Sequence, residues 1–206
     1  MSFNTSRSKP CSSLWNKMQW HPTSKQLKTF IALQALLEDW NKRVNLTRLI
    51  DGNDYWIAQI LDSLWPLDKD LSDTQTQVNC VDVGSGCGFP GLALAIALPN
   101  SKLTLIEAVS RKALILKNIA KELGIQKRVT VLNERAELTG QNPNFRGQFD
   151  FAMARAVASA PIVCEYLIPL LKQKGQALIY QGKWSELNQY NHNKALILLN
   201  AKISSV

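Results

Sequence analysis

A glycine-rich loop and three carboxylates are spaced along the chain in a way that suits a nucleotide-like cofactor. An apolar strand runs into glycines 84, 86, 88 and 91 within residues 81–91. Glycine lets the backbone turn sharply and leaves room for a ligand, and the free N–H groups of the following helix face that ligand. Asp82 stands two residues before the first glycine, whereas Glu107 and Glu137 follow the next two predicted strands. The pattern predicts a cofactor cradle with three acidic positions around it.

The loop alone leaves two cofactors open. Residues 86–91 satisfy the dinucleotide fingerprint G-x-G-x-x-G, and residues 84–88 satisfy the shorter G-x-G-x-G of S-adenosylmethionine-dependent methyltransferases. Glu107 suits both classes, because each places an acid there to hold the ribose hydroxyls. Asp82, expected near the methionine end, and Glu137, expected near the adenine, favour the methyl donor. An NAD-dependent oxidoreductase on the same fold stays open as the alternative.

The elements that position these residues fall into a helical part and an alternating part. Apolar residues recur at helical spacing over 24–44 and again over 54–65, where Pro66 is expected to end the second helix. Residues 68–77 are polar and read as a linker. From residue 78 on, strands alternate with helices. The expected strands are 78–83, 102–107, 128–132, 149–154 and 176–180, and the expected helices are 90–98, 110–123 and 159–171.

This alternation predicts an α/β fold with a mostly parallel sheet, right-handed crossovers and a helical N-terminal extension. A polar loop with Gly140, Pro143 and Gly147 is expected between the third and fourth strands. We expect two regions, a helical one over residues 1–77 and a cofactor-binding domain over residues 78–206. Residues 1–22 are expected to be poorly ordered.

Composition narrows the class of protein. The chain has 206 residues, 46% of them hydrophobic, and no apolar run long enough to span a membrane. Its net charge is +8, with two basic regions flanking an acidic one over residues 51–100, which favours a polyanionic partner.

The cysteines and histidines suggest no metal site. Four cysteines form no C-x-x-C pair and the chain has two histidines, so we expect reduced thiols, no structural metal and a cytoplasmic location. Residues 1–13 contain serine and basic residues but no acid, which leaves an organelle as the alternative location. Cys87 lies inside the glycine loop and reads as a small loop residue rather than a nucleophile.

Further motifs surround the loop in a fixed order. They are W-N-K-R-V-N-L-T at 40–47, W-I-A-Q-I-L-D-S-L at 56–64, G-S-G-C-G-F-P-G at 84–91, E-A-V-S-R-K at 107–112, R-A-E at 135–137 and A-R-A-V-A at 154–158. Together they resemble the glucose-inhibited division protein B family, bacterial and plastid enzymes that methylate N7 of one guanosine in small-subunit (16S) ribosomal RNA. The resemblance implies a Rossmann-like class I methyltransferase fold and S-adenosylmethionine as cofactor. It implies ribosomal RNA, or the assembling small subunit, as partner, and we expect a monomer.

The resemblance also implies residue roles. The cofactor would contact Asp82, Gly84, Gly86, Gly88, Phe89, Glu107, Ala108, Ala136, Glu137 and Arg155. RNA would contact Asn45, Arg111, Lys112 and Lys117. Asp62, Arg155 and Arg135 would act at the target base, and Asn45, Asp62 and Ser63 would close the pocket. The Phe89 ring either stacks on the cofactor or packs the following helix onto the sheet.

Guanine N7 needs no catalytic base, because its in-plane lone pair attacks directly and no proton leaves N7. Three departures from the family pattern stand out. Gln59 replaces the usual histidine and removes a titratable group, and Gln181 replaces a lysine at the end of the fifth strand. The chain also ends at Val206, before a further strand pair usual in the family. A non-catalytic RNA-binding relative therefore stays open as a third reading.

Overall fold

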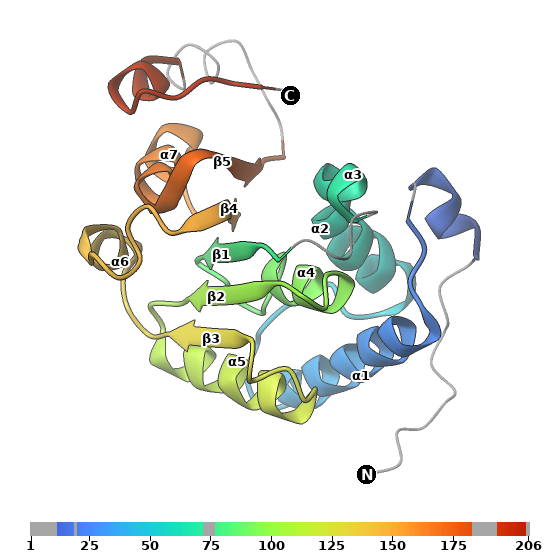
Figure 1. Ribbon diagram of the computed structural model, residues 1–206. Coiled ribbons are helices and arrows are strands. Elements are labelled where there is room, and N and C mark those ends of the chain that lie inside the picture. Colours follow the sequence, from blue (N-terminus) through green and yellow to red (C-terminus); the bar gives the residue numbers. More distant parts are fainter. Residues whose placement is uncertain (1–11, 19, 72–76, 183–192, 205–206) are drawn as a thin grey trace.

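The computed structural model describes residues 12–18, 20–71, 77–182 and 193–204. A sheet of five parallel strands crosses the molecule in the order β3-β2-β1-β4-β5 (Figure 1). The strands are β1 (Asn79–Val83), β2 (Lys102–Ile106), β3 (Val129–Leu132), β4 (Phe149–Arg155) and β5 (Leu171–Tyr180). The predicted α/β class and parallel sheet are confirmed.

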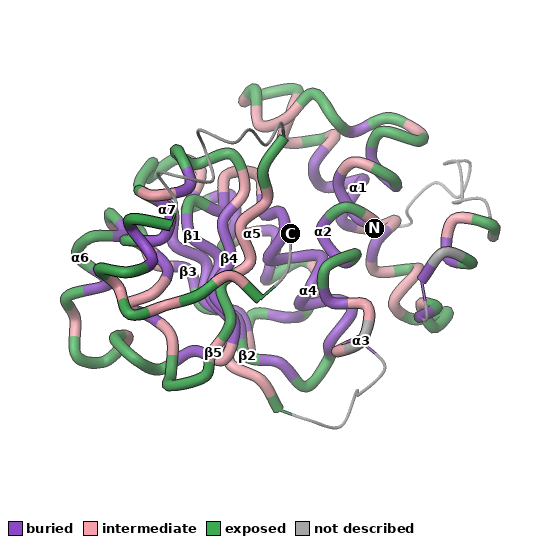
Figure 2. Tube along the Cα trace, turned by 90° about the horizontal axis from the view of Figure 1, so that it is seen from above, coloured by how far each residue is buried: buried purple, intermediate pink, exposed green. Residues whose placement is uncertain are grey.

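Helices cover both faces of this sheet. The helices α4 (Gly91–Ala97) and α5 (Ser110–Glu122) pack on one face with α1 (Ser24–Asn41) against them, whereas α6 (Ala136–Gln141) and α7 (Ala160–Leu167) cover the other. Successive side chains of a strand point to opposite faces. Accordingly, Phe151 and Met153 join the cluster under α4 and α5, and Ala152 and Ala154 join the other. Buried residues therefore run along the strands (Figure 2).

The first long helix begins at residue 24, as its spacing predicts, and its first turn is capped. Thr23 is the N-cap of α1 and forms a capping box with Gln26, in which each side chain bonds the backbone of the other residue. The Gln26 amide also reaches across to the last turn of α4, where Nε2 donates to the carbonyls of Ala97 at 2.8 Å and Ile96 at 3.2 Å. One side chain thus caps two helices and ties the N-terminal region to the sheet.

The second helical segment differs from the prediction. It runs as a π-helix η2 (Asp54–Leu61), then α2 (Asp62–Leu64), a 3-10 turn η3 (Trp65–Leu67) and α3 (Asp68–Leu71). Pro66 therefore does not end the helix, because it sits at the start of a 3-10 turn, where a missing N–H costs little. Ile57, predicted to be buried, is 48% exposed. The wider π turn rotates side chains away from the positions that α-helical spacing predicts.

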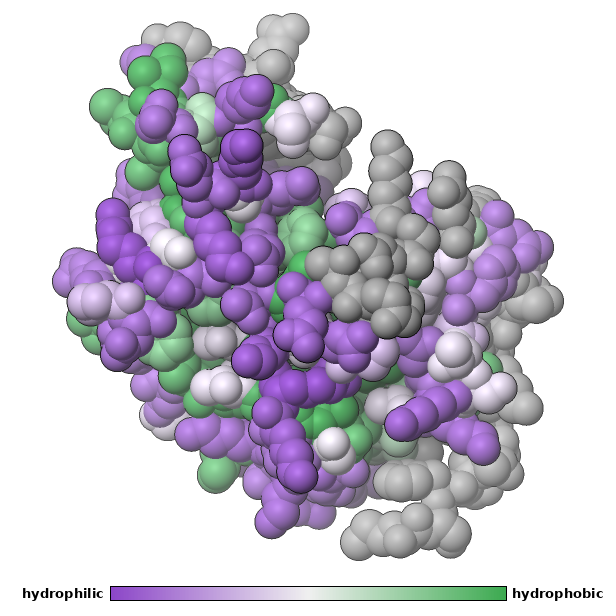
Figure 3. Space-filling view, viewed as in Figure 1, coloured by the Kyte–Doolittle hydropathy of each residue, from purple (hydrophilic) through white to green (hydrophobic). Residues whose placement is uncertain are grey.

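The remaining differences concern short or irregular elements. The helix α6 lies inside the segment predicted as a polar loop, and α7 ends at Leu167 before a 3-10 turn η4 (Ile168–Leu170). The strand β5 begins at Leu171 rather than at residue 176, with an irregular register against β4 between Phe149 and Phe151. Residues 193–198 form a further helix. This helix, at the upper left of Figure 1, carries the exposed Ile197 and Leu198, and Figure 3 shows hydrophobic surface at the same end of the molecule.

The N-terminal region and the sheet share one core. Residues of a 3-10 helix η1 (Ser12–Lys17) and of the segment after it join the cluster that includes α1 and α4. The Trp15 ring packs edge-on against Trp20 at 5.8 Å and Trp56 at 6.3 Å between centroids. Within the range expected to be poorly ordered, these aromatic residues are packed, because burying them removes large apolar areas from water. Residues 1–11 and 19, and residues 72–76 of the predicted linker, lie outside the described residues. Residues 68–71 of that linker form the helix α3, so this part of the prediction is wrong.

Candidate active site

The carboxyl ends of the parallel strands bring the candidate residues to one edge of the sheet. Val83 at the end of β1 pairs with Ile106 on β2 and with Ala154 on β4. The glycine loop, Glu107 and Arg155 follow directly on these three strands. Open α/β sheets bind their ligands at this edge. The geometry therefore places the cradle and the Arg155 guanidinium side by side.

The glycine loop needs its glycines for two different reasons. Gly84 and Gly86 adopt left-handed φ values of 69° and 57°, which side chains rarely tolerate. A Cβ on Gly84 would lie 2.6 Å from Cγ2 of Val157, in the segment after β4. A Cβ on Gly86 would meet only the Gly84 carbonyl oxygen, at 3.7 Å. The space above Gly86 is therefore open, as a ligand cradle requires.

Gly88 and Phe89 are packed against the protein interior, whereas the space at Gly86 is open. A Cβ on Gly88 would lie 2.4 Å from Cδ1 of Leu92, so this glycine allows α4 to approach the loop. The Phe89 ring is 4% exposed and packs edge-on against Tyr55 at 6.2 Å between centroids. Of the two readings of Phe89, the structure favours packing over stacking on the cofactor.

Glu107 is held beside the loop by the backbone. It is buried, and its Oε2 accepts from the Gly86 N–H while Oε1 accepts from the Val109 N–H, both at 2.8 Å. The Asn133 amide donates to the carbonyl of Glu107 at 2.9 Å and to that of the exposed Ala108 at 3.2 Å. Bonds from two backbone donors fix the carboxylate before any ligand arrives, as the predicted ribose contact requires.

Asp82 lies deeper than its predicted contact with the cofactor allows. Its side chain is fully buried, and Oδ2 accepts from the Gly91 N–H at 3.0 Å. Oδ1 has no hydrogen-bond partner among the described residues. Burial raises the pKa of Asp82 to about 7, although the Gly91 N–H and the charge of Arg155 oppose the shift. Asp82 therefore supports the glycine loop from inside the protein, through its bond to the Gly91 N–H. The start of α4 can come this close because Gly91 has no Cβ, which would lie 2.7 Å from Asp82 Oδ2.

The residues after β3 form a separate group. Ala136 is buried at the start of α6, and the exposed Glu137 accepts a hydrogen bond from the Tyr166 hydroxyl at 3.1 Å. Arg135 is exposed and precedes α6. Among the described residues, no hydrogen bond or ion pair joins Arg135 to Asp62 or Arg155. Of the three residues expected at the target base, the structure thus joins two.

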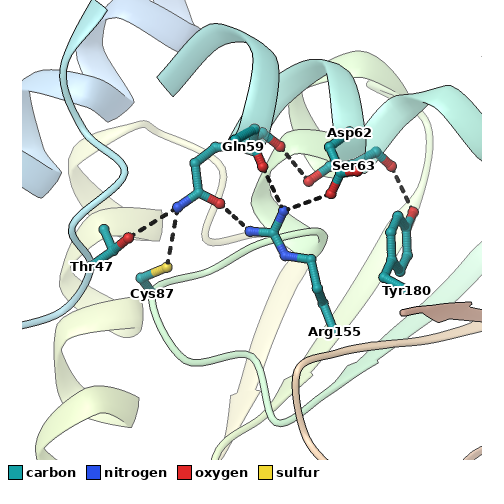
Figure 4. A network of polar contacts seen from close by, with 8 residues as sticks. Thr47, Gln59, Asp62, Ser63, Cys87, Arg155 and Tyr180 are labelled. Atoms are coloured by element: carbon teal, nitrogen blue, oxygen red, sulfur yellow. Dashed lines mark hydrogen bonds and ion pairs between the residues drawn. The ribbon is translucent and has the colours of Figure 1, made fainter. Parts of the chain in front are cut away.

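Those two residues belong to a polar network between the helical segment and β4 (Figure 4). Arg155 Nη1 donates to Asp62 Oδ2 at 3.1 Å and to the carbonyl of Ala58 at 2.9 Å, and Nη2 donates to Gln59 Oε1. The Arg155 side chain is 17% exposed, whereas that of Asp62 is 53% exposed. Ala58 and Gln59 thus fix the Arg155 guanidinium on its buried side, while the Asp62 carboxylate stays accessible.

Gln59 extends the network toward the glycine loop. Its Nε2 donates to Thr47 Oγ1 at 3.1 Å and lies 4.0 Å from Cys87 Sγ. Burial raises the pKa of the Cys87 thiol, which keeps it protonated at neutral pH and agrees with its reading as a loop residue. Thr47 was not singled out from the sequence, although the motif at 40–47 that ends with it was the available signal.

Ser63 and Tyr180 complete the network on the β5 side. The Ser63 hydroxyl donates to the carbonyl of Gln59 at 2.5 Å, and the Tyr180 hydroxyl donates to the carbonyl of Ser63 at 2.7 Å. Ser63 is fully buried, so it supports the helix instead of closing a pocket. Sequence reasoning missed Tyr180, because only the fold reveals that the end of β5 reaches the helix.

A cavity of about 370 Å³ adjoins the carboxyl ends of β4 and β5. Its walls include Ala156, Ser159, Tyr180 and Gln181, all close in sequence to the ends of the two strands. Ala156 adopts a left-handed φ of 56° directly after Arg155. Non-glycine residues held in this region often mark functional sites.

The residues expected to contact RNA lie around the start of α5. Asn45, Arg111 and Lys117 are exposed and Lys112 is half-buried. Arg111 Nη2 donates to the carbonyl of Arg43 at 3.1 Å, which holds the loop after α1 against α5. The described residues contain no group of three or more His, Cys, Asp or Glu that could hold a metal ion, and no helix among them is long and apolar enough to cross a membrane.

The strand order, the cradle after β1 and the acid after β2 define a Rossmann-like fold, which both cofactors left open by the sequence would fit. Solved structures narrow this to the fold of class I S-adenosylmethionine-dependent methyltransferases. An O-methyltransferase from Bacillus cereus in complex with SAH matches with a TM-score of 0.57 at 16% identity, over 83% of this chain and 80% of that one. A [4+2]-cyclase matches with a TM-score of 0.55 at 19% identity, over 86% and 73%.

The chain belongs to the GidB family, whose model, rRNA small subunit methyltransferase G, matches residues 26–206. A ribosomal RNA small subunit methyltransferase G of Prochlorococcus marinus (strain MIT 9313) is 57% identical over 95% of this chain and 79% of its own length. The protein of that name from Synechococcus sp. (strain WH7803) is 53% identical over 96% and 78%. The family resemblance is confirmed, the chain is an S-adenosylmethionine-dependent methyltransferase, and the NAD alternative is set aside.

Proposed function

We propose that this enzyme transfers the methyl group of S-adenosylmethionine to N7 of a guanosine in small-subunit ribosomal RNA. The observation that carries the proposal is the Asp62 carboxylate, half exposed and held by Arg155 at the sheet edge beside the glycine cradle. The names of its relatives, which specify the RNA of the small ribosomal subunit, support the choice of substrate.

The residues present fit S-adenosylmethionine. The open space above Gly86 accepts a ligand, and the buried Glu107 carboxylate beside it suits the hydroxyls of a ribose. Ala136 and Glu137 follow β3 on the same edge and are the candidates for the adenine end. Asp82 would act from below, through the Gly91 N–H that it holds. When bound, the cofactor supplies an electrophilic methyl group on a sulfonium.

The protein has to align the acceptor base and stabilise its changing charge. Methylation at N7 makes the guanine cationic, and a carboxylate close to the base favours that charge. Asp62 is the group for this role, because its oxygens are accessible while Arg155 fixes their position. Positioning of the two reactants accounts for a large share of such a rate enhancement, since it removes their loss of translational freedom from the barrier.

The RNA would approach over the basic residues that follow β2. Arg111 and Lys112 open α5 at the same edge as the cradle, and Lys117 continues along its exposed side. Phosphate contacts of this kind make affinity fall as salt rises. Action as a cytoplasmic monomer remains our prediction.

The test compares ribosomal RNA from cells with and without this protein by mapping N7-methylguanosine. We expect one modified position to disappear without the protein and to return with it, but not with Asp62→Ala. Purified Asp62→Ala should bind S-adenosylmethionine as the native protein does. An unchanged modification map would refute the proposed function. Full turnover by Asp62→Ala would remove only the role of Asp62.

A further inference from the structure

We infer that Gln59 is a positioning residue for methyl transfer: its amide fixes the Arg155 guanidinium and couples it to the loop that carries Thr47. The inference deepens the proposed function and rests on it for the identity of the acceptor base. No part of it requires Gln59 to touch either substrate.

The two ends of the Gln59 amide can face only one way. Arg155 donates hydrogen bonds and accepts none, so Gln59 must turn Oε1 toward it. Nε2 then faces Thr47 Oγ1, which accepts from it at 3.1 Å. The side chain is 1% exposed, and water is therefore a poor substitute for either partner. The buried Gln59 amide is thus anchored to Thr47 at one end and orients the Arg155 guanidinium with the other.

The position of Thr47 is itself set by the last residue of α1. Asn41 Oδ1 accepts from the backbone N–H of Leu46 at 2.8 Å and of Thr47 at 3.2 Å. Asn41 Nδ2 donates to the carbonyl of Thr47 at 2.6 Å. A chain of hydrogen bonds therefore runs from α1 through Thr47 and Gln59 to the end of β4.

The same arrangement limits what Arg155 can offer a base. The guanidinium has five N–H donors, and the Ala58 carbonyl, Gln59 and Asp62 occupy three of them, including both on Nη1. An unrestrained arginine commonly grips guanine at O6 and N7 together. That grip would cover the nitrogen that has to be methylated. Holding Arg155 inward leaves it able to bind a neighbouring acceptor such as O6 while N7 stays free.

An amide at this position does not titrate. Of the charged or titratable groups, Arg155 and Cys87 contact the amide, and Asp62, Asp82 and Tyr180 interact with Arg155. A neutral histidine could replace both functions of the amide, since one ring nitrogen accepts and the other donates. A protonated histidine would point a donor at Arg155 and break the contact. Gln59→His should therefore lose activity at low pH in a step that the native enzyme lacks, whereas titration of Asp82, whose pKa is about 7, affects both proteins alike.

The experiment measures kcat, KM and cofactor affinity for the native chain, Gln59→Leu, Arg155→Lys and the double variant. We expect Gln59→Leu to lower kcat about 10- to 100-fold, the usual effect of unpairing a charged donor, and to change cofactor affinity less than about 3-fold. In the Arg155→Lys background the same substitution should cost less than about 2-fold, because the residue through which it acts is gone.

Gln34→Leu is the matched control. Gln34 is also a buried helical glutamine, 2% exposed, whose Nε2 donates to the Ile50 carbonyl at 2.7 Å away from the site. It should lose stability but keep kcat within about 2-fold. The inference fails if Gln59→Leu lowers kcat no more than Gln34→Leu does, if its loss is as large in the Arg155→Lys background, or if Gln59→His shows no step with pH beyond that of the native enzyme.

A second readout does not depend on activity. Nitrogen-15 NMR of the arginine side chains reports rotation about the Cζ–Nη bonds, with Arg155→Lys assigning the signal. We expect Gln59→Leu to speed this rotation for Arg155, and unchanged rotation would overturn the inference. If the native chain methylates no RNA, the proposed function fails on its own, and this measurement still decides whether Gln59 fixes Arg155.

Discussion

At the scale of single residues, the acidic and basic side chains of the site differ in depth: Asp82 lies under the glycine loop, whereas Glu107 and Arg155 lie beside it. Glu107 and Arg155 were expected at strand ends, and both reach the carboxyl edge. Asp82 was expected to touch the cofactor but is fully buried, because Gly91 brings a helix directly over it. The burial of a side chain depends on how closely two elements pack, and this distance cannot be predicted from a single sequence.

Gly86→Ala should weaken cofactor binding at little cost in stability. The new Cβ would enter the open cradle, and the left-handed φ of 57° adds strain of about 1 kcal/mol. Gly124 is the matched control: its φ is 69° and a Cβ there would meet nothing within 4 Å, but it follows α5, away from the cradle. Calorimetry should show at least about a 10-fold loss of affinity for Gly86→Ala only. Equal affinities for the two variants would contradict the cradle.

Asp82 should make the stability of the free protein fall as pH rises. Its folded pKa of about 7 lies above its ordinary value of 3.8, so between these values the folded state holds a proton that the unfolded state releases. Stability then falls by up to about 1.4 kcal/mol per pH unit from about pH 4 to about pH 7, and levels off above. Urea unfolding of the native chain and of Asp82→Asn from pH 5 to pH 8 checks this. Parallel curves would exclude a raised pKa.

At the scale of elements, hydrophobic spacing predicted the long helices well and the short ones poorly. The helix α1 was expected from residue 24 and begins there, and α5, expected over 110–123, runs from Ser110 to Glu122. The six residues of α6 make fewer than two turns, too few to show a periodic pattern. The π-helix η2 was missed because helical spacing assumes an α-helix, and the contacts of Gln59 with Thr47 and Arg155 depend on it.

Gln26→Ala should destabilise the protein by about 1–2 kcal/mol, because it removes the capping box of α1 and the cap on the last turn of α4. Cofactor affinity should not change, since neither helix end touches the cradle. Chemical denaturation is the measurement, and Lys28→Ala, at an exposed position of the same helix, should cost less than about 0.5 kcal/mol. A cost for Gln26→Ala as small as that of Lys28→Ala would contradict the double cap.

At the scale of the whole molecule, the predicted helical region and cofactor-binding domain are not separate cores. Trp15 and Trp56 belong to the same buried cluster as Leu94 of α4 and Leu105 of β2. The sequence suggested two regions because hydrophobic periodicity changes near residue 78. Hydrophobic periodicity shows which face of an element is buried, but not which other elements pack against that face.

The whole chain should therefore unfold in one transition. Most tryptophans lie in the N-terminal region, at positions 15, 20, 40, 56 and 65. Their fluorescence follows that region, whereas far-ultraviolet circular dichroism follows all helices and strands. We expect the two midpoints to coincide in Trp184→Phe, which leaves only those five fluorophores. A fluorescence transition that precedes the loss of dichroism would show that the helical region detaches first.

The contact between Gly84 and Val157 joins the loop after β1 to the segment after β4. With 2.6 Å between a Cβ at position 84 and Cγ2 of Val157, the two positions share one volume. The left-handed φ of 69° keeps position 84 a glycine, so the steric limit falls on position 157 alone. Across homologous sequences, position 157 is therefore expected to vary less in size than its exposure alone would allow, because its side chain also sets the room beside the cofactor loop.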